Sequence, residues 1–285
     1  MGIGGNLMWT PLAYEIYKKT GKISVFVKNT KNGKIIINDK IGLWKNLDFI
    51  FDNEFNLTYN DVFNDPKYFL IDMDLRPDLN NKKQPNISNH IIINRCAYFH
   101  CFYPRLKTYM NFNDEEYNYI KKIISELPPK FIIIEPHAKT SWCEHKQYPI
   151  EKWQKVIDDL YKNIPFVQMS LPDNLVMKNV INVGNKVRNF RDCALLLKYA
   201  CLFVGTEGGF MHAAQVHNTK CVCLFSPMFD PKWTKYPDDD SLWVYEGNHR
   251  NCFIQGTCNR CLKAMNNYDY KKIINKIKKK LKISN

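Results

Sequence analysis

Several features that mark membrane and secreted proteins are missing from this chain of 285 residues. No apolar run approaches the roughly 20 residues that span a bilayer as a helix. No basic segment followed by an apolar stretch opens the sequence, as it would in a secretory signal. Internal repeats and low-complexity segments are also missing, which leaves a globular architecture. We therefore expect a cytoplasmic protein, with peripheral attachment at the inner membrane face as a remaining alternative.

The cysteines and the charge narrow the class of protein further. Several of the ten cysteines lie in apolar, strand-like runs, among them Cys201, Cys221 and Cys223, where they act as small hydrophobic residues in a reducing compartment. The net charge of +13 favours anionic partners such as nucleotide phosphates, an anionic glycan, lipid headgroups or nucleic acid. A solvated lysine-rich surface explains the same charge equally well. The sequence has no recognised nucleic-acid motif and no interleaving of basic and aromatic residues.

Strand and helix patterns alternate along the chain in two series, divided at the two prolines of residues 128 and 129. This alternation predicts an α/β fold with parallel sheets and two Rossmann-like domains facing a cleft, residues 1–128 and 129–285. A lysine-rich amphipathic helix at residues 268–283 is expected to pack on the protein rather than lie on a membrane. The expected strands are residues 23–27, 35–37, 68–73, 90–93, 131–134, 165–169, 201–204 and 221–225, and the other helices are 10–20, 114–127, 149–161 and 191–200.

Residues 201–227, CLFVGTEGGFMHAAQVHNTKCVCLFSP, carry the clearest functional signal. They predict a glycine-rich turn between two buried strands, with a helix that begins near Phe210. The first N–H groups of a helix lack partners within it and attract phosphate. Glu207 and His212 flank this helix start, so an acceptor and a potential cation lie beside the expected phosphate.

Two further segments can contribute to the same chemistry. Residues 2–11, GIGGNLMWTP, predict a glycine turn, then a helix with Thr10 as its cap and a proline at its first position. The loop at residues 136–148 follows a buried strand, where ligands bind in open α/β sheets. Its lysines, Lys139 and Lys146, could hold a diphosphate together with His145 and the hydroxyls of Thr140 and Ser141. A solvated polar loop is the simpler interpretation of that segment alone.

Taken in order, these segments resemble glycosyltransferase family 9, the heptosyltransferase-like enzymes of GT-B fold. The family pattern GDxLxxTP is similar to GGNLMWTP at residues 4–11. Its KxWP loop and following helix are similar to KQYP at residues 146–149 with Trp153. Its D-(S/T)-GxxHxA signature, followed by (G/S)P, is similar to EGGFMHAA at residues 207–214 and FSP at 225–227. The resemblance covers most of the chain.

The resemblance implies transfer of a sugar from a nucleotide diphosphate sugar, with inversion at the anomeric carbon. The C-terminal domain would bind the donor and the N-terminal domain the acceptor. Gly208, Gly209 and His212 would hold the diphosphate, and Lys146 would neutralise the leaving group. Glu207 replaces the aspartate of the family and would accept a hydrogen bond from a donor hydroxyl. No metal is implied for this reaction.

The chain departs from the family at the expected catalytic base. Gly5 occupies the position of the acidic residue and Asn6 follows it, and neither can act as a base at neutral pH. Glu15 is a candidate substitute. Almost no residues precede this motif for the usual first strand, so the N-terminal sheet is expected to begin differently or the chain to start upstream. A non-catalytic GT-B-like protein that binds a nucleotide or glycan is the alternative function, and a nucleic-acid-associated protein is a third.

The last cysteines form a separate group. His249, Cys252, Cys258 and Cys261 offer four soft ligands, and a Cys-x₂-Cys pair is common in zinc sites. The second pair at standard spacing is missing. Free thiols in a loop are therefore the preferred interpretation, with zinc at Cys252, Cys258 and Cys261 as the alternative.

Overall fold

The computed structural model describes residues 3–37, 39, 41–51, 57–74, 90–138, 140, 143–169, 175–254 and 256–283. The chain divides into two compact units, Met1–Asn113 and Asp114–Asn285. The sequence placed this division later, after helix α5 (Asp114–Ile124). The helix belongs to the second unit because it packs on α7 (Phe190–Leu196), where the Arg191 guanidinium donates hydrogen bonds to both carboxylate oxygens of Glu116. A cleft between the two domains stays a prediction.

The first unit contains a three-stranded sheet in the order β2-β1-β3. The β1–β3 pair is parallel, as expected, and β2 joins β1 as an antiparallel hairpin strand. The elements of this unit are α1 (Ile3–Leu7), α2 (Thr10–Thr20), β1 (Ile23–Thr30), β2 (Gly33–Ile36), α3 (Tyr59–Phe63), β3 (Tyr68–Asp72) and α4 (Ile91–Tyr98).

Two expectations about the start of the first unit are wrong. Residues 3–7 form helix α1 and not a glycine turn, and α2 then begins at Thr10. Thr10 is the first residue of α2 and not its cap: its hydroxyl donates to the Leu7 carbonyl at 2.8 Å and accepts the backbone N–H of Tyr109 at 2.9 Å. The hydroxyl therefore ties the α1–α2 junction to a distant segment of the same unit.

The expected strand at residues 90–93 is the start of helix α4. Its β-branched isoleucines favour a strand locally. The ring of His90 overrides that preference, because its Nδ1 accepts the backbone N–H of Ile92 at 3.1 Å and so caps the helix.

The second unit contains a six-stranded sheet, parallel throughout, in the order β6-β5-β4-β7-β8-β9. Counted within the unit, this is the order 3-2-1-4-5-6 of dinucleotide-binding sheets, and the connections reverse direction between β4 and β7. Its elements, after α5, are β4 (Ile132–Glu135), η1 (Glu144–Lys146), α6 (Ile150–Leu160), β5 (Phe166–Gln168), β6 (Val180–Asn182), α7 (Phe190–Leu196), η2 (Leu197–Tyr199), β7 (Leu202–Thr206), α8 (Gly209–Ala214), η3 (Gln215–His217), β8 (Cys221–Phe225), η4 (Pro231–Trp233), β9 (Asp240–Trp243), α9 (Asn259–Asn267) and α10 (Tyr270–Leu281).

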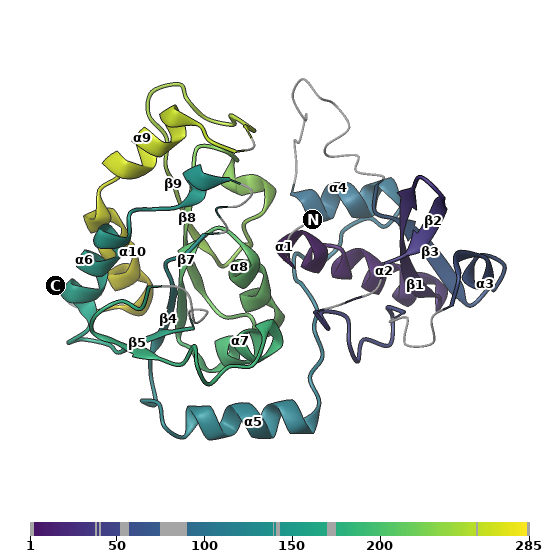
Figure 1. Cartoon of the computed structure of the whole chain (residues 1–285), viewed down its shortest axis with the longest axis horizontal. Coiled ribbons are helices and arrows are strands. Elements are labelled where there is room, and N and C mark those ends of the chain that lie inside the picture. The colour runs from purple at the N-terminus through teal and green to yellow at the C-terminus, as the bar shows by residue number, and fades with distance from the viewer. Residues whose placement is uncertain are drawn as a thin grey trace. The chain divides into compact units, whose positions relative to one another are not determined.

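Helices cover both faces of this sheet. Figure 1 shows α6 and α10 on one face, and α7 and α8 on the other. The apolar stripe of the terminal helix, with Ile273, Ile274 and Ile277, is buried in the core beside Trp153 of α6. The terminal helix α10 therefore packs against α6 within the second unit. Among the described residues, no helix is long and apolar enough to cross a membrane.

Gly205 lies opposite Glu135 in the pairing of β7 with β4, where there is no room for a side chain. A Cβ built on Gly205 would lie 2.7 Å from the Glu135 carbonyl oxygen and 3.0 Å from the Phe203 ring. Because the first contact is with backbone of a paired strand, Gly205→Ala should lower the free energy of unfolding by about 3 kcal/mol. Urea unfolding measures this loss. Gly208→Ala is the matched control, since its Cβ would meet nothing nearer than 4.0 Å. Equal stability of the two variants would contradict the prediction.

Candidate functional site

Two loops meet at the point where the strand order of the second unit reverses. The loop after β4 ends in the η1 turn that carries Lys146, and the loop after β7 carries Glu207 and leads into α8. Ligands of open α/β sheets bind beyond the carboxyl ends of the strands at such a reversal. The fold therefore brings together the two segments that the sequence singled out.

An ion pair joins the loops directly, between the Lys146 ammonium and Oε2 of Glu207, with 14% and 10% of these side chains exposed. Nε2 of His212 lies 3.9 Å from the other carboxylate oxygen. Burial opposes ionisation of Glu207, but Lys146 and His212 outweigh it and hold the pKa of the carboxyl below its usual value. The site thus presents one anion between two groups that can carry positive charge.

Tyr236 and Phe229 belong to this site and were not identified from the sequence. The Tyr236 hydroxyl lies 2.8 Å from Nδ1 of His212, and its side chain is fully buried. This contact fixes the orientation of the imidazole, with Nε2 toward Glu207. The ring of Phe229 lies 5.7 Å from the Lys146 ammonium. No motif marks either residue, because both follow β8 in irregular segments.

The remaining predicted site residues are spread over both units. Gly208 precedes α8 and Gly209 begins it, and Thr140 is exposed in the loop after β4. Ser141 lies outside the described residues, as does Lys139. In the first unit, Asn6 lies in α1, and Glu15 lies in α2 with one carboxylate oxygen 3.5 Å from Lys18 Nζ. Gly5, at the position of the family's acidic residue, accepts a hydrogen bond from Arg95 through its carbonyl oxygen. The roles assigned to all these residues stay predictions.

Glu135 is a buried carboxyl at the carboxyl end of β4, with 8% of the residue exposed. Burial raises the pKa of Glu135 to about 7, although its Oε1 accepts the backbone N–H of His137 at 3.0 Å. The sequence carried a signal for it that was overlooked: an acidic residue at the end of a buried run of isoleucines.

The raised pKa of Glu135 predicts a pH dependence of stability. Between pH 4.5 and about 7 the unfolded chain loses this proton while the folded chain keeps it, so stability falls as the pH rises through this window. Relative to Glu135→Gln, the wild type should lose about 3 kcal/mol between pH 4.5 and 8. Urea unfolding at both pH values measures the difference, with Glu126→Gln, an exposed carboxylate, as the control. Parallel pH profiles of the free energy of unfolding for the wild type and Glu135→Gln would contradict this prediction.

A second cluster combines one imidazole and three thiols. The ligand atoms of His249, Cys252, Cys258 and Cys261 all lie within 4.8 Å of one another, and the three cysteines are free. The closest distances are 3.1 Å from His249 Nε2 to Cys261 Sγ, 3.2 Å between Cys252 Sγ and Cys261 Sγ, and 3.4 Å from Cys258 Sγ to His249 Nε2. Cys258 immediately precedes α9, and Cys261 lies in the first turn of this helix.

This donor set fits a thiophilic metal ion. A tetrahedral site with metal–sulfur bonds of about 2.3 Å and metal–nitrogen bonds of about 2.0 Å separates its ligand atoms by about 3.5 to 3.8 Å. The three closest separations are shorter than this by up to about half an ångström, and none of the others exceeds 4.8 Å, so side-chain movements of about 1 Å or less bring the four atoms to a tetrahedral arrangement. The tertiary structure supplies His249 beside the three cysteines, and four converging ligands favour the metal site over separate free thiols.

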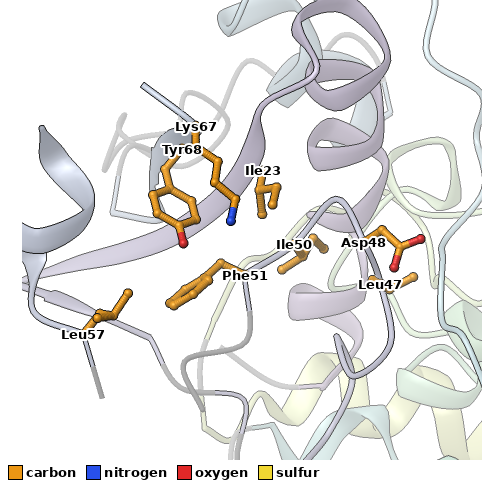
Figure 2. Close-up of a pocket in the computed structure, with 8 residues that line it drawn as sticks. All are labelled: Ile23, Leu47, Asp48, Ile50, Phe51, Leu57, Lys67 and Tyr68. Atoms are coloured by element: carbon orange, nitrogen blue, oxygen red, sulfur yellow. The ribbon is translucent and has the colours of Figure 1, made fainter. Parts of the chain in front are cut away.

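A cavity of about 440 Å³ lies in the first unit, far along the sequence from these clusters. Figure 2 shows Ile23, Phe51, Lys67 and Tyr68 around it. Ile23 and Tyr68 are the first residues of β1 and β3. The cavity therefore lies at the amino ends of these strands, opposite to the edge where α/β sheets bind ligands, and we do not assign it to the site.

Comparison with solved structures identifies the fold. A glycosyltransferase family 9 protein from Veillonella parvula DSM 2008 matches 100% of this chain and 96% of its own, with a TM-score of 0.69 and 12% identity. TibC, an iron-containing dodecameric glycosyltransferase from enterotoxigenic E. coli H10407, matches 99% of this chain and 74% of its own, with a TM-score of 0.63 and 11% identity. No protein-family model and no curated protein matches the sequence. The resemblance to the family 9 fold, predicted from three short motifs, is confirmed.

Proposed function

We propose that this protein is an inverting glycosyltransferase that moves a sugar from a nucleotide diphosphate sugar to a hydroxyl group of a glycan or lipid-linked acceptor. The observation that carries the proposal is the Lys146–Glu207–His212 cluster at the strand reversal of a family 9 fold. The same location is where a Rossmann sheet binds a diphosphate. A cytoplasmic location, where such donors are made and thiols stay reduced, agrees with this function.

The second unit stabilises the leaving group in this proposal. The acceptor oxygen attacks the anomeric carbon from the face opposite the diphosphate, the bond between that carbon and the phosphate oxygen breaks, and its electron pair stays on the nucleotide diphosphate. Lys146 and protonated His212 lie where they can neutralise the negative charge that develops. Gly208 and Gly209 have no side chains to keep a phosphate from the backbone N–H groups of α8. In the absence of donor, Glu207 keeps the lysine in place.

The acceptor hydroxyl must lose its proton as it attacks. Asn6 cannot take this proton, because an amide is not a base at neutral pH. We assign the proton to the Glu15 carboxylate, which is largely buried in α2 with 15% of its side chain exposed. Glu15→Gln should then abolish transfer while donor binding is kept, whereas Asn6→Ala should affect acceptor binding.

A donor screen tests the proposal. A true donor should raise the melting temperature, because it binds only the folded protein. At one hundred times its Kd the donor adds about 2.7 kcal/mol to the free energy of unfolding. Nucleotide diphosphate sugars of different bases and sugars are compared by thermal shift, and those that bind are tested for transfer and hydrolysis. Lys146→Ala and His212→Ala should each lower turnover of the active donor by about a hundredfold or more. Full activity in both variants would refute the site assignment.

A non-catalytic function is the second candidate. It is favoured by one observation: the acidic residue of the family's first motif is replaced by Gly5, whose carbonyl oxygen serves a structural contact with Arg95. Saturable binding of a nucleotide without turnover of any donor would support this candidate, and turnover would exclude it.

We also propose that the His249–Cys252–Cys258–Cys261 cluster holds zinc or iron. Support comes from the four converging ligands and from TibC, a structural match that contains iron. A metal in this set would act structurally, since four protein ligands leave no open position for substrate. Elemental analysis of protein purified without chelator identifies the metal.

A further inference from the structure

The loop between Cys252 and Cys258 contacts the turn that carries Lys146. The Gly256 carbonyl oxygen lies 3.1 Å from Nδ1 of His145, the neighbour of that lysine. The Thr257 hydroxyl donates to the Glu144 carboxylate at 2.7 Å, and Gly256 also forms an isolated bridge with Cys143. The loop thus holds both residues of η1 that precede Lys146, Glu144 and His145.

The other end of the loop reaches the aromatic side of the same site. Phe253, next to Cys252, stacks on Trp233 with ring centroids 5.0 Å apart and an interplanar angle of 16°. Its ring also lies 5.7 Å from Phe229, the aromatic ring beside the Lys146 ammonium. The φ angle of Phe253 is 53°, a left-handed value that a phenylalanine adopts only when its surroundings impose it.

We propose that the His249–Cys252–Cys258–Cys261 metal centre positions Lys146 for the diphosphate, through Gly256 and Thr257 on one side and Phe253 on the other. The inference rests on the proposed metal and donor sites. It gives the centre a role in donor affinity that is distinct from general stability. The four ligands are positioning residues in this role, because they act on Lys146 through the loop between Cys252 and Cys258.

The position of the ligands explains the coupling. Cys252 and Cys258 bracket the loop, while His249 and Cys261 anchor it to the segment after β9 and to α9. With both ends joined to one ion, the loop has few conformations, and Gly256 stays against His145. Without that closure the loop gains conformational entropy. The Lys146 turn then loses its contacts, and its ammonium is no longer fixed opposite the diphosphate.

Metal removal from the full-length protein tests the inference. Backbone hydrogen exchange is compared before and after chelation, together with binding of inorganic pyrophosphate by calorimetry. We expect faster exchange in residues 143–147 and 252–258, unchanged exchange in residues 153–160 of α6, and pyrophosphate binding weakened by about tenfold. Restored metal should reverse all changes. Unchanged exchange at residues 143–147 after metal loss would overturn the positioning role.

A variant that keeps all four ligands separates positioning from metal loss. Gly256 has a φ of +86°, and an added Cβ meets no atom within 4 Å, so Gly256→Ala strains only the local backbone. Gly21→Ala is the matched control, with a φ of +70°, open space and a place in the first unit. We expect Gly256→Ala to retain its metal but weaken pyrophosphate binding by about fivefold, and Gly21→Ala to bind normally. Equal pyrophosphate affinity of the two metal-loaded variants would overturn the proposal.

The readouts separate three failures. If the purified protein contains no metal, the metal site is rejected, and the inference is rejected with it. If the metal-loaded protein does not bind pyrophosphate, the donor site of the proposed function is rejected, and the proposed effect on donor affinity is rejected with it. If the protein binds both metal and pyrophosphate, and chelation changes neither the exchange nor the affinity, the coupling alone is rejected. The proposed function and the metal site are then retained.

Discussion

Lys146→Ala is expected to lower kcat/KM for donor turnover by a factor of about 10² to 10³. The ammonium lies at the strand reversal with 14% of its side chain exposed, so no solvent cation can replace it efficiently as the diphosphate leaves. Steady-state kinetics with the donor identified by the thermal-shift screen measures this effect. Lys263→Ala, which removes a lysine paired with Glu246 on the surface, should change kcat/KM by less than about twofold.

The same substitution leaves the Glu207 carboxylate buried without its main partner. Breaking a buried ion pair typically destabilises a protein by about 3 to 5 kcal/mol, so lost activity could reflect partial unfolding. The double variant Lys146→Ala/Glu207→Gln removes the orphaned charge. It should recover most of the melting temperature and none of the turnover. Recovery of turnover together with stability would show that Lys146 acts only as a structural partner.

Cys261→Ser is expected to release the bound metal and to lower the melting temperature of the second unit by about 10 °C. A structural metal contributes its binding free energy to folding, and about 1 kcal/mol corresponds to 2–4 °C for a unit of this size. Cys261 is fully buried in the first turn of α9, where its thiol approaches two other ligands. Differential scanning calorimetry and elemental analysis of the same sample measure both effects.

Cys201→Ser is the control for this experiment. Its Sγ lies 3.0 Å from the Phe131 carbonyl oxygen, a contact that a hydroxyl can also make, and it lies outside the metal cluster. We expect full metal content and a melting temperature within about 2 °C of the wild type. A wild-type protein that carries a Cys252–Cys261 disulfide and no metal, detected as a mass two hydrogens lower, would contradict the prediction.

The sequence predicted best where local pattern and tertiary structure agree. Buried apolar runs such as residues 131–134, 201–204 and 221–225 correspond to β4, β7 and β8, because a strand covered on both faces must be apolar at every position. The expected helix at residues 149–161 corresponds to α6, whose apolar face recurs at helical spacing. The short strands β6 and β9, which have no fully buried residue, were missed, since they carry little pattern of their own.

Capping and glycine positions misled the prediction where particular side-chain contacts decide the structure. Residues 90–93 have the composition of a strand, but the His90 ring caps them as the start of a helix. The glycines of residues 4 and 5 lie inside α1 and not in a turn. Thr10 was expected to cap α2, but its hydroxyl is used by Leu7 and by Tyr109, ninety-nine residues away. Contacts of this kind leave no local periodicity in a single sequence.

By itself the sequence determined the alternation of strands and helices in the second unit and the order of three motifs that resemble family 9. Both are local properties, set by periodicity and spacing. Only the tertiary structure decided that Lys146 and Glu207, sixty-one residues apart, form an ion pair across the strand reversal, and that Tyr236 orients His212. It also brought His249 to the three cysteines and set their loop against His145. These arrangements depend on which strands become neighbours, and that is settled by packing of the whole core rather than by any one segment.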